Sequence, residues 1–353
     1  MRIALITDTH WGARGDSAIF AEFFNTFYYE KFFPYLKENN ITQIFHLGDI
    51  VDRRKYINFV TSRHLSKFVE TCHESNIKLD VIIGNHDTSF KNTNEVNSMN
   101  ELFSHSEYSI DYYSSPKEVE IDGLKIAVLP WVCTGNYEES MKFLADTNAQ
   151  VLFGHLEIQG FEMYKGSIND HGFQTSLFDK FDLVCSGHFH HKSTKGNIAY
   201  LGAPYEMSWS DYDDPRGFHV FDTDTRELTF IDNPYKMFSK IHYNDAGQTL
   251  DKLINIDFSA YKGKYIKVVV HEKNNPYWFD MFIDKLEKSG VVDIQVVEDN
   301  LNLNLEDDSD IVDEAEDTIT ILRKVTEQMD TNVDKKKLDN FLRVLYNEAL
   351  SVE

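Results

Sequence analysis

Short apolar runs recur along the first two thirds of the chain and alternate with segments whose apolar residues are spaced by three and four. The runs are short enough to be strands, and the segments 18–36 and 57–72 have the spacing of helices packed on a sheet. This alternation predicts an α/β protein. The strand-like runs cover residues 3–7, 43–47, 79–83, 125–129, 150–154 and 182–186.

The pattern changes after residue 216. Apolar runs at 217–221 and 228–231, joined by the turn-rich residues 222–225, predict a hairpin that closes a first domain, 1–232. After Asn233-Pro234, residues 238–297 predict a small second α/β domain. We expect its helices at 246–254 and 278–288 and its strands around Ile241, at 265–270 and at 291–297.

The C-terminal part combines an acidic run with an amphipathic stretch. Residues 306–317 are dense in carboxylates, which predicts an extended, solvated linker over 298–317. In the tail, 318–353, the stretch 337–352 has one apolar face at helical spacing. Such a helix either folds back on the second domain or binds a partner protein, and the linker before it favours a partner.

Composition narrows the class of protein. The net charge of -23 argues against a protein that coats nucleic acid by general electrostatic attraction, so a polyanion would be bound locally. The cysteines are few and widely spaced, which indicates reduced thiols and a cytoplasmic protein. We expect neither a signal peptide nor a membrane span, because no run reaches the roughly 18 apolar residues that a span needs.

Polar side chains able to bind metals follow the ends of five apolar runs. The carboxyl ends of strands in α/β sheets meet at one crevice, so these side chains are expected to converge. Glycine stands just before Asp49, Asn85, His155 and His188 and allows the backbone to approach closely. The strand-end residues are Asp8, His10, Asp49, Asn85, His86, Asp87, His155, His188 and His190.

The chemistry of this set points to a metal centre. Carboxylate, imidazole and amide ligands together suit Mn²⁺, Fe²⁺ or Zn²⁺ better than Mg²⁺ or Ca²⁺, which prefer oxygen ligands. The set exceeds what one ion needs, so two ions about 3.5–4 Å apart are the economical interpretation. A lone histidine is more often a hydrogen-bonded core residue, and the prediction depends on the repetition at five strand ends.

The strand-end motifs resemble those of the calcineurin-like metallophosphoesterases. They read Gly48-Asp49, Gly84-Asn85-His86-Asp87, Gly154-His155 and Gly187-His188-Phe189-His190. The resemblance implies a four-layer α/β/β/α sandwich and two divalent ions, which we take to be Mn²⁺. It assigns Asp8, His10, Asp49 and His190 to one metal and Asp49, Asn85, His155 and His188 to the other.

The resemblance also implies roles outside the ligand set. His86 would act as general acid or phosphate-contacting cation, and Asp87 would orient its ring. His191 would have no ligand role and lie at the surface. Arg53 and Arg54 either contact substrate phosphates or form a solvated basic turn.

The flanking segments bear on the substrate. Residues 48–53 are similar to a protein-phosphatase motif, but Arg54 and Asp87 stand where those enzymes have glycine and glutamate. The segments 201–210 and 216–221 are similar to those of SbcD-type DNA-end-processing nucleases. Those nucleases carry a small α/β capping domain and a tail that binds the coiled-coil base of an SbcC-type ATPase, which 238–297 and 318–353 match in layout.

The resemblance therefore predicts a Mn²⁺-dependent DNA nuclease that acts at DNA ends with an ATPase partner in repair and recombination. It is expected to be an exonuclease, with endonuclease activity left open, and a homodimer through helices near 57–75 and 92–105. Asp52 stands where several relatives have histidine, so exonuclease polarity cannot be carried over. The alternatives are a small-molecule or phosphoprotein phosphoesterase, and a non-catalytic tether of DNA ends.

Overall fold

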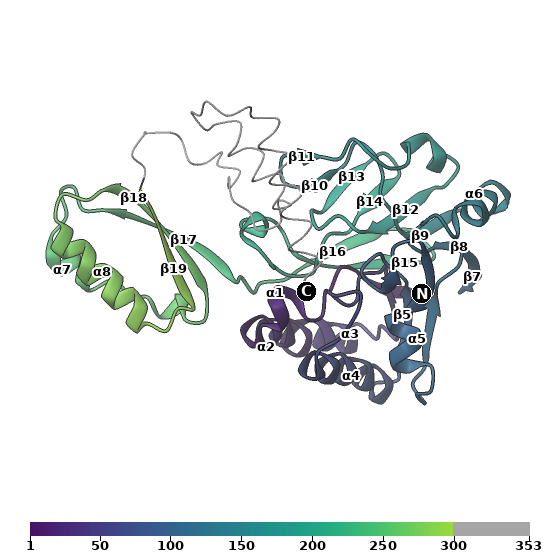
Figure 1. Ribbon diagram of the computed structural model, residues 1–353, viewed down its shortest axis with the longest axis horizontal. Helices are drawn as coiled ribbons and strands as arrows, with labels where there is room; N and C mark the ends of the chain where they lie inside the picture. The colour runs from purple at the N-terminus through teal and green to yellow at the C-terminus, as the bar shows by residue number, and fades with distance from the viewer. Residues whose placement is uncertain (299–353) are drawn as a thin grey trace, which may run out of the picture. The chain divides into compact units, whose positions relative to one another are not determined.

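The computed structural model describes residues 1–298, of which 1–207 and 211–298 form one compact unit. Its main part has two six-stranded sheets with helices on their outer sides (Figure 1). The predicted α/β class is confirmed. The acidic linker and the helical tail predicted beyond Glu298 lie outside the described residues, and the division of the chain into domains stays a prediction.

The first sheet has the strand order β16-β15-β1-β2-β3-β6. Its strands β1, β2, β3 and β6 are parallel, and β15 and β16 form the predicted antiparallel hairpin beside β1. The strands are β1 (Arg2–Ile6), β2 (Gln43–His46), β3 (Lys78–Ile82), β6 (Ile110–Tyr113), β15 (Gly217–Asp222) and β16 (Leu228–Asp232).

The second sheet has the order β13-β14-β12-β9-β8-β7. Its central strands are parallel, and an antiparallel strand lies at each edge. The strands are β7 (Lys117–Ile121), β8 (Leu124–Leu129), β9 (Val151–His155), β12 (Leu183–Gly187), β13 (Ser193–Lys195) and β14 (Ile198–Tyr200).

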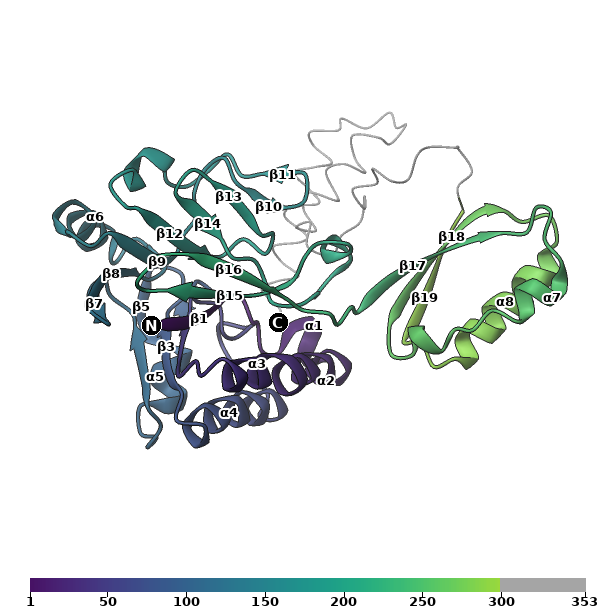
Figure 2. The ribbon, with the colours of Figure 1, turned by 180° about the vertical axis from the view of Figure 1, so that it is seen from behind.

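The core is layered as the family resemblance implies. One apolar cluster contains side chains of both sheets, such as Leu5 and Phe45 from the first and Val128 and Phe153 from the second. A second cluster combines the outer face of the second sheet with Leu144 of α6 (Tyr137–Asp146). Four helices lie beside the first sheet in both ribbon views (Figure 2): α2 (Ala18–Phe27), α3 (Phe33–Glu38), α4 (Phe59–Glu74) and α5 (Ser98–Phe103). Burial of the apolar side chains in these two clusters stabilises the sheets and so fixes the positions at which their strands end.

The helices on the first sheet differ in detail from the sequence pattern. The predicted helix 18–36 is divided into α2 (Ala18–Phe27), a π-helical turn (Tyr28–Phe32) and α3 (Phe33–Glu38). Pro34 lies in the first turn of α3, and since it lacks an N–H it cannot donate the bond that one continuous α-helix would require. The helix predicted at 57–72 is α4 (Phe59–Glu74), which begins after Asn58, whose side chain accepts from Val60 N.

The region 88–103 departs further from the sequence pattern. Residues expected to form a helix near 92–105 contain a hairpin strand first, with β4 (Thr88–Phe90) paired to β5 (Thr93–Asn97). Only Ser98–Phe103 is helical, as α5, because the Asn97 side chain accepts from Asn100 N at 2.9 Å and caps the helix there. A further short pair is β10 (Glu162–Tyr164) with β11 (Ser167–Ile168).

Residues 238–298 form a three-stranded parallel sheet with the order β17-β18-β19. Its core combines strand residues such as Val268 with Phe282 of α8. Helix α7 is shorter than predicted, since Gly247 has a φ of 67° and the helix begins only at Leu250. Within residues 1–298 no helix has the length and apolar character that a bilayer crossing needs. The elements are β17 (Phe238–Asn244), α7 (Leu250–Ile254), β18 (Tyr265–Glu272), α8 (Pro276–Lys288) and β19 (Asp293–Glu298).

Candidate metal centre

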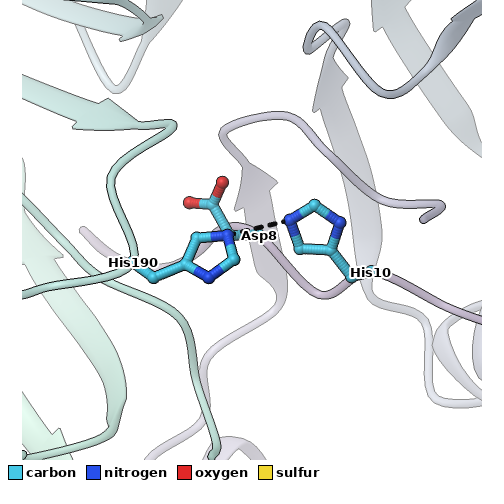
Figure 3. A group of neighbouring side chains, drawn as sticks. All are labelled: Asp8, His10 and His190. Atoms are coloured by element: carbon cyan, nitrogen blue, oxygen red, sulfur yellow. Dashed lines mark hydrogen bonds between the residues drawn. The ribbon is translucent and has the colours of Figure 1, made fainter. Parts of the chain in front are cut away.

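A first group of candidate ligands joins the ends of β1 and β12. Asp8 and His10 follow β1, His190 follows β12, and one donor atom from each lies within 4.8 Å of the others (Figure 3). The Nε2 atoms of His10 and His190 are 3.0 Å apart. A hydrogen bond between two imidazoles uses one proton, so one of these nitrogens presents a lone pair, as a metal ligand must.

The backbone after β1 has an uncommon conformation that aims these side chains. Asp8 and His10 have φ values of 51° and 42°, in the left-handed region that is unfavourable for residues with a Cβ atom. Asp8 N donates to Gly48 O at 3.0 Å, and His10 N donates to Asp49 O at 3.1 Å. These bonds fasten the end of β1 to the end of β2 and offset the strain.

Asp49 belongs to two further groups of possible ligands. One contains His10 and His86, and the other contains His155 and His188. Asp49 Oδ2 lies 3.3 Å from His155 Nε2 and 3.9 Å from His10 Nε2, while Oδ1 accepts from His86 N at 2.7 Å. A carboxylate placed between two ligand groups is the arrangement that a bridging ligand of two ions requires.

Asn85 joins the two histidines of the group at the ends of β9 and β12. Its Oδ1 atom is 3.0 Å from His155 Nε2 and 2.9 Å from His188 Nδ1. The other ring nitrogen of His155, Nδ1, donates to Leu47 O at 2.8 Å. This bond orients the ring so that Nε2 faces Asp49 and Asn85. The structure thus brings the predicted ligand residues together from both sheets.

The electrostatics of the centre fit divalent cations. Burial, together with His86 and His190, holds the pKa of His10 well below its usual value, and burial lowers the pKa of His188 to about 3. Burial would raise the pKa of Asp49, but His155 and other imidazoles hold it well below its usual value. Burial opposes charge on His155 too, yet Asp49 raises its pKa to about 9. The His10 and His188 rings are thus neutral beside an ionised carboxylate, as metal ligands must be, and a bound cation would replace the proton on His155.

Gly84 and Gly187, at the ends of strands, have no side chain, and neighbouring residues occupy the space where a Cβ atom would lie. A Cβ atom on Gly84 would lie 2.3 Å from Asp49 N, and one on Gly187 would lie 2.0 Å from Thr7 Oγ1. Both distances are far below van der Waals contact. The glycines therefore let β3 and β12 end directly against the residues that follow β2 and β1.

Asp87 has a different contact from the one expected. It was expected to orient the ring of His86, but His86 Nδ1 instead donates to the carbonyl oxygen of Asp52 at 2.6 Å. The buried Asp87 carboxylate accepts from Asp49 N, Ile50 N and Gly84 N at 2.8, 2.9 and 2.8 Å. Burial and the nearby Asp49 raise its pKa to about 7 in spite of these bonds. Asp87 thus organises the backbone beneath the centre.

Of the two arginines after Asp49, Arg53 has hydrogen-bond and ion-pair partners within the protein. Arg53 donates to the Tyr56 hydroxyl at 2.6 Å and lies 3.1 Å from Asp16. Arg54 Nη1 is buried and has no hydrogen-bond partner among the described residues. Contact of either residue with a substrate stays a prediction. His191, expected at the surface, is partly buried, and its Nδ1 lies 3.0 Å from Asp214 Oδ2.

Sequence reasoning did not single out two neighbours of the centre. The ring centroid of Trp131 is 5.1 Å from that of His188. Trp131 follows the run 125–129 as the ligands follow the other runs, and that position is a signal that could have found it. The buried Arg216 donates to the carbonyl oxygen of His190 and lies 2.8 Å from Asp211 and 2.7 Å from Asp214. No sequence signal reveals a bond to a carbonyl group.

Residues 1–192 match the calcineurin-like phosphoesterase family. The chain belongs to that family. A calcineurin-like phosphoesterase is a metal-dependent hydrolase of phosphoesters, and its family uses a pair of metal ions. The three groups of neighbouring side chains around Asp8, His10, Asp49, His155, His188 and His190 contain candidate ligands in this member. The resemblance inferred from the strand-end motifs is therefore confirmed.

Individual relatives extend the match of this phosphoesterase beyond residue 192. It is 33% identical over 318 residues to exonuclease subunit 1 of Enterobacteria phage T4, covering 89% of this chain and 90% of the relative. Among solved structures it is similar to a dimetal phosphatase of Danio rerio, with 12% identity, 62% of this chain and 91% of that chain covered, and a TM-score of 0.40. A nuclease of Pseudomonas putida has 14% identity, 65% and 87% coverage, and a TM-score of 0.30.

Proposed function

We propose that this protein is a Mn²⁺-dependent DNA nuclease that hydrolyses phosphodiesters at a centre of two metal ions. It would act as an exonuclease, with endonuclease activity left open. The observation that carries the proposal is the position of Asp49 between two groups of imidazoles, in a chain that is 33% identical over 318 residues to a phage exonuclease subunit.

The ligand assignment is the one that the strand-end motifs of the family imply. Mixed nitrogen and oxygen donors favour Mn²⁺ over Mg²⁺. Bound ions would supply the acidification of a water molecule and the neutralisation of phosphate oxygens. One ion would be held by Asp8, His10, Asp49 and His190, and the other by Asp49, Asn85, His155 and His188.

His86 is proposed to handle the proton. Its Nδ1 donates to Asp52 O at 2.6 Å, which fixes the ring and leaves Nε2 to meet the substrate. From there it would protonate the leaving oxygen or contact a phosphate oxygen. Asp87 supports this step indirectly, because it holds the backbone at Asp49 and Gly84. Arg53 and Arg54 are proposed to contact phosphates nearby.

The test compares two substrates with the purified chain in Mn²⁺. We expect degradation of linear duplex DNA and little turnover of p-nitrophenyl phosphate, a monoester. Asp49→Asn should abolish DNA degradation and bind less Mn²⁺ by elemental analysis, since it removes the charge that both ligand groups share. Monoester turnover with intact DNA would instead identify a small-molecule or phosphoprotein phosphoesterase, and unchanged DNA handling by Asp49→Asn would identify a tether.

We also propose an assembly. The tail 318–353 would bind the coiled-coil base of an SbcC-type ATPase, and DNA ends would be the shared substrate. The exposed apolar side chains of Phe59 on α4, 93% exposed, and Phe90 in the adjacent hairpin, 55% exposed, support a homodimer in this region. Free, buried Cys72, Cys133 and Cys185 agree with a cytoplasmic protein.

Two measurements test the assembly. Co-purification with a candidate coiled-coil ATPase should be lost when residues 330–353 are deleted, and unaltered association would refute the tail assignment. Light scattering of the isolated chain should give the mass of a dimer, and Phe59→Glu should convert it to a monomer. A wild-type chain that is monomeric at all concentrations would contradict the proposed homodimer.

A further inference from the structure

Two adjoining hollows open beside the metal centre. One has a volume of about 660 Å³ and is lined by residues that include Lys91, Trp131 and Tyr137. The other has a volume of about 300 Å³ and is lined by residues that include Trp131, Tyr137 and His155. Because Trp131 and Tyr137 line both, the hollows are neighbouring parts of one depression, and we call it the Trp131 depression. Both volumes fall in the range of small-ligand sites.

The Trp131 depression adjoins the ligand group of β9 and β12. His155 forms part of its wall, and the ring centroid of Trp131 lies 5.1 Å from that of His188 and 6.2 Å from that of His155. The Trp131 indole therefore lies within reach of the nucleoside that is attached to a phosphate held at the metal centre. Neither hollow is needed for the roles assigned above to His86 and the metal ligands.

The side chains of the Trp131 depression suit a base better than a phosphate. Trp131, Tyr137 and Phe173 supply aromatic faces, and the Tyr137 side chain is 51% exposed. Glu138 and Glu157 supply carboxylates, which repel phosphates but accept hydrogen bonds from the amino groups of bases. Lys91 is the one lysine or arginine among the described lining residues. A phosphate track would be lined by cations instead.

The wall of the Trp131 depression is built before any ligand arrives. Trp131 N donates to Ile83 O at 2.8 Å, and Trp131 O accepts from Asn94 Nδ2 at 2.8 Å and from Asn136 Nδ2 at 3.0 Å. Both asparagines are buried. Gly135 N donates to Asn92 O at 2.9 Å, so this loop is tied to the β4–β5 hairpin. These bonds fix the backbone that carries Trp131, so no backbone ordering of this wall is needed when a base stacks on the indole.

We propose that the Trp131 depression receives the base of a nucleotide adjoining the scissile phosphate, stacked on Trp131 and Tyr137. This proposal rests on the nuclease function above and deepens it by specifying the substrate as an unpaired nucleotide. A base inside a duplex is stacked on its neighbours, so it must leave the stack to enter the depression. Frayed or single-stranded ends would therefore be cut faster than closed duplex ends.

The test scans a single-stranded oligonucleotide with one abasic residue placed at successive positions, using the full chain in Mn²⁺. Wild type should lose about tenfold in kcat/KM when the missing base adjoins the scissile bond, since a base stacked on an aromatic side chain contributes about that much. Trp131→Ala should lose a similar factor on the intact oligonucleotide. It should lose nothing further on the abasic one, because the two changes remove the same contact.

Two more variants separate stacking from damage to the metal centre. Trp131→Phe keeps an aromatic face and should recover most of the loss. Tyr137→Ala removes the second aromatic side chain on which the base is proposed to stack. It should likewise slow cleavage of the intact oligonucleotide and cause no further loss on the abasic one. If Trp131→Ala and the abasic residue reduce the rate by independent factors, the indole acts on the centre and the base proposal is overturned.

The remaining outcomes distinguish this proposal from the function on which it rests. Equal cleavage of intact and abasic oligonucleotides by wild type would overturn the Trp131 depression as a base site while the nuclease function stands. Failure of wild type to cleave any oligonucleotide or duplex would overturn both. Selective loss on the intact substrate, with recovery in Trp131→Phe, supports both.

Discussion

His86 and Asp49 occupy different positions in the centre, and substitutions should separate their roles. His86→Gln keeps a polar side chain of similar reach but cannot transfer a proton as imidazole does. We expect kcat on DNA to fall by about 10²–10⁴, with bound Mn²⁺ unchanged by elemental analysis after gel filtration. Asp49→Asn is the matched variant that should lose metal. Loss of metal from His86→Gln would make His86 a ligand, in line with its place in a group with His10 and Asp49.

His219, away from the centre on β15, should make the fold sensitive to acid. Its ring is buried and its Nδ1 has no hydrogen-bond partner among the described residues. Burial, with a smaller effect from Lys192, lowers its pKa to about 3, from the usual histidine pKa of about 6.5. The unfolded chain therefore takes up a proton first as pH falls, so this contribution to stability is complete above about pH 6.5 and is lost toward pH 3.

The expected loss from His219 between pH 7 and pH 5 is about 2 kcal/mol of unfolding free energy. His219→Leu should remove that part of the pH dependence, as measured by urea denaturation at both values. The unfolding free energy of the wild-type protein would then fall more steeply from pH 7 to pH 5 than that of the variant. Parallel slopes would mean that the folded protein lets the His219 ring take up a proton.

Single residues show how far the site could be predicted from the sequence. The candidate ligand residues could be found because each follows an apolar run, and the ends of strands converge in this class of fold. The partners of Asp87 and His86 could not, since their bonds are to backbone groups at Asp49 and Asp52, whose directions depend on the turns between strands. The contact of Arg216 could not be predicted for the same reason, because Arg216 donates to the backbone carbonyl oxygen of His190.

At the scale of elements, the ends of β2 and β3 require the absence of a side chain at Gly84. An alanine Cβ would lie 2.3 Å from both Asp49 N and Asp49 Oδ1, so Asp49 would have to move. We expect Gly84→Ala to lose at least about 100-fold in kcat and to bind less Mn²⁺, because small displacements of reacting groups are costly. Gly123→Asn is the control, since nothing lies within 4 Å of its Cβ position and asparagine accommodates the positive φ of 78° there better than alanine does. Normal activity of Gly84→Ala would show that the strand ends can separate.

A buried cluster of charges lies in the segment between β14 and β15, and its Arg216 also donates to His190 O in the loop after β12. Arg216 is 1% exposed and pairs with Asp211 and Asp214. Arg216→Met would leave two carboxylates buried without their cation, so we expect a loss of roughly 3–5 kcal/mol in unfolding free energy. Arg226→Met, which breaks the surface pair with Asp182, should change it by less than about 1 kcal/mol. Similar values for the two variants in urea denaturation would contradict a structural role for the buried cluster.

Elements with a regular spacing of apolar residues could be predicted from the sequence. Elements whose bounds depend on one proline, glycine or helix-capping residue could not. The six strand-like runs of the first domain correspond to β1, β2, β3, β8, β9 and β12. The π-helical turn, the late start of α7 and the β4–β5 hairpin depend instead on Pro34, Gly247 and Asn97. Their effects are local, and a helical period cannot reveal them.

For the molecule as a whole, the dominant electrostatic fact is its net charge of -23. A protein that binds DNA through many basic side chains releases counterions, and its affinity falls steeply with salt. Here the cationic Arg53, close in sequence to Asp49, is already paired with Asp16. The long-range interaction of the isolated chain with DNA should therefore be repulsive and its binding weak.

This repulsion predicts an unusual dependence on ionic strength. Raising monovalent salt from about 20 to 150 mM shortens the screening length to about 8 Å, so kcat/KM on long DNA at constant, saturating Mn²⁺ should rise severalfold. A dinucleotide substrate, which carries little charge, is the control and should change much less. A steep fall with salt on long DNA would contradict the prediction and reveal a basic track that outweighs the acidic surface. A rise with salt would support the proposed assembly, in which an ATPase bound through the tail brings DNA to the centre.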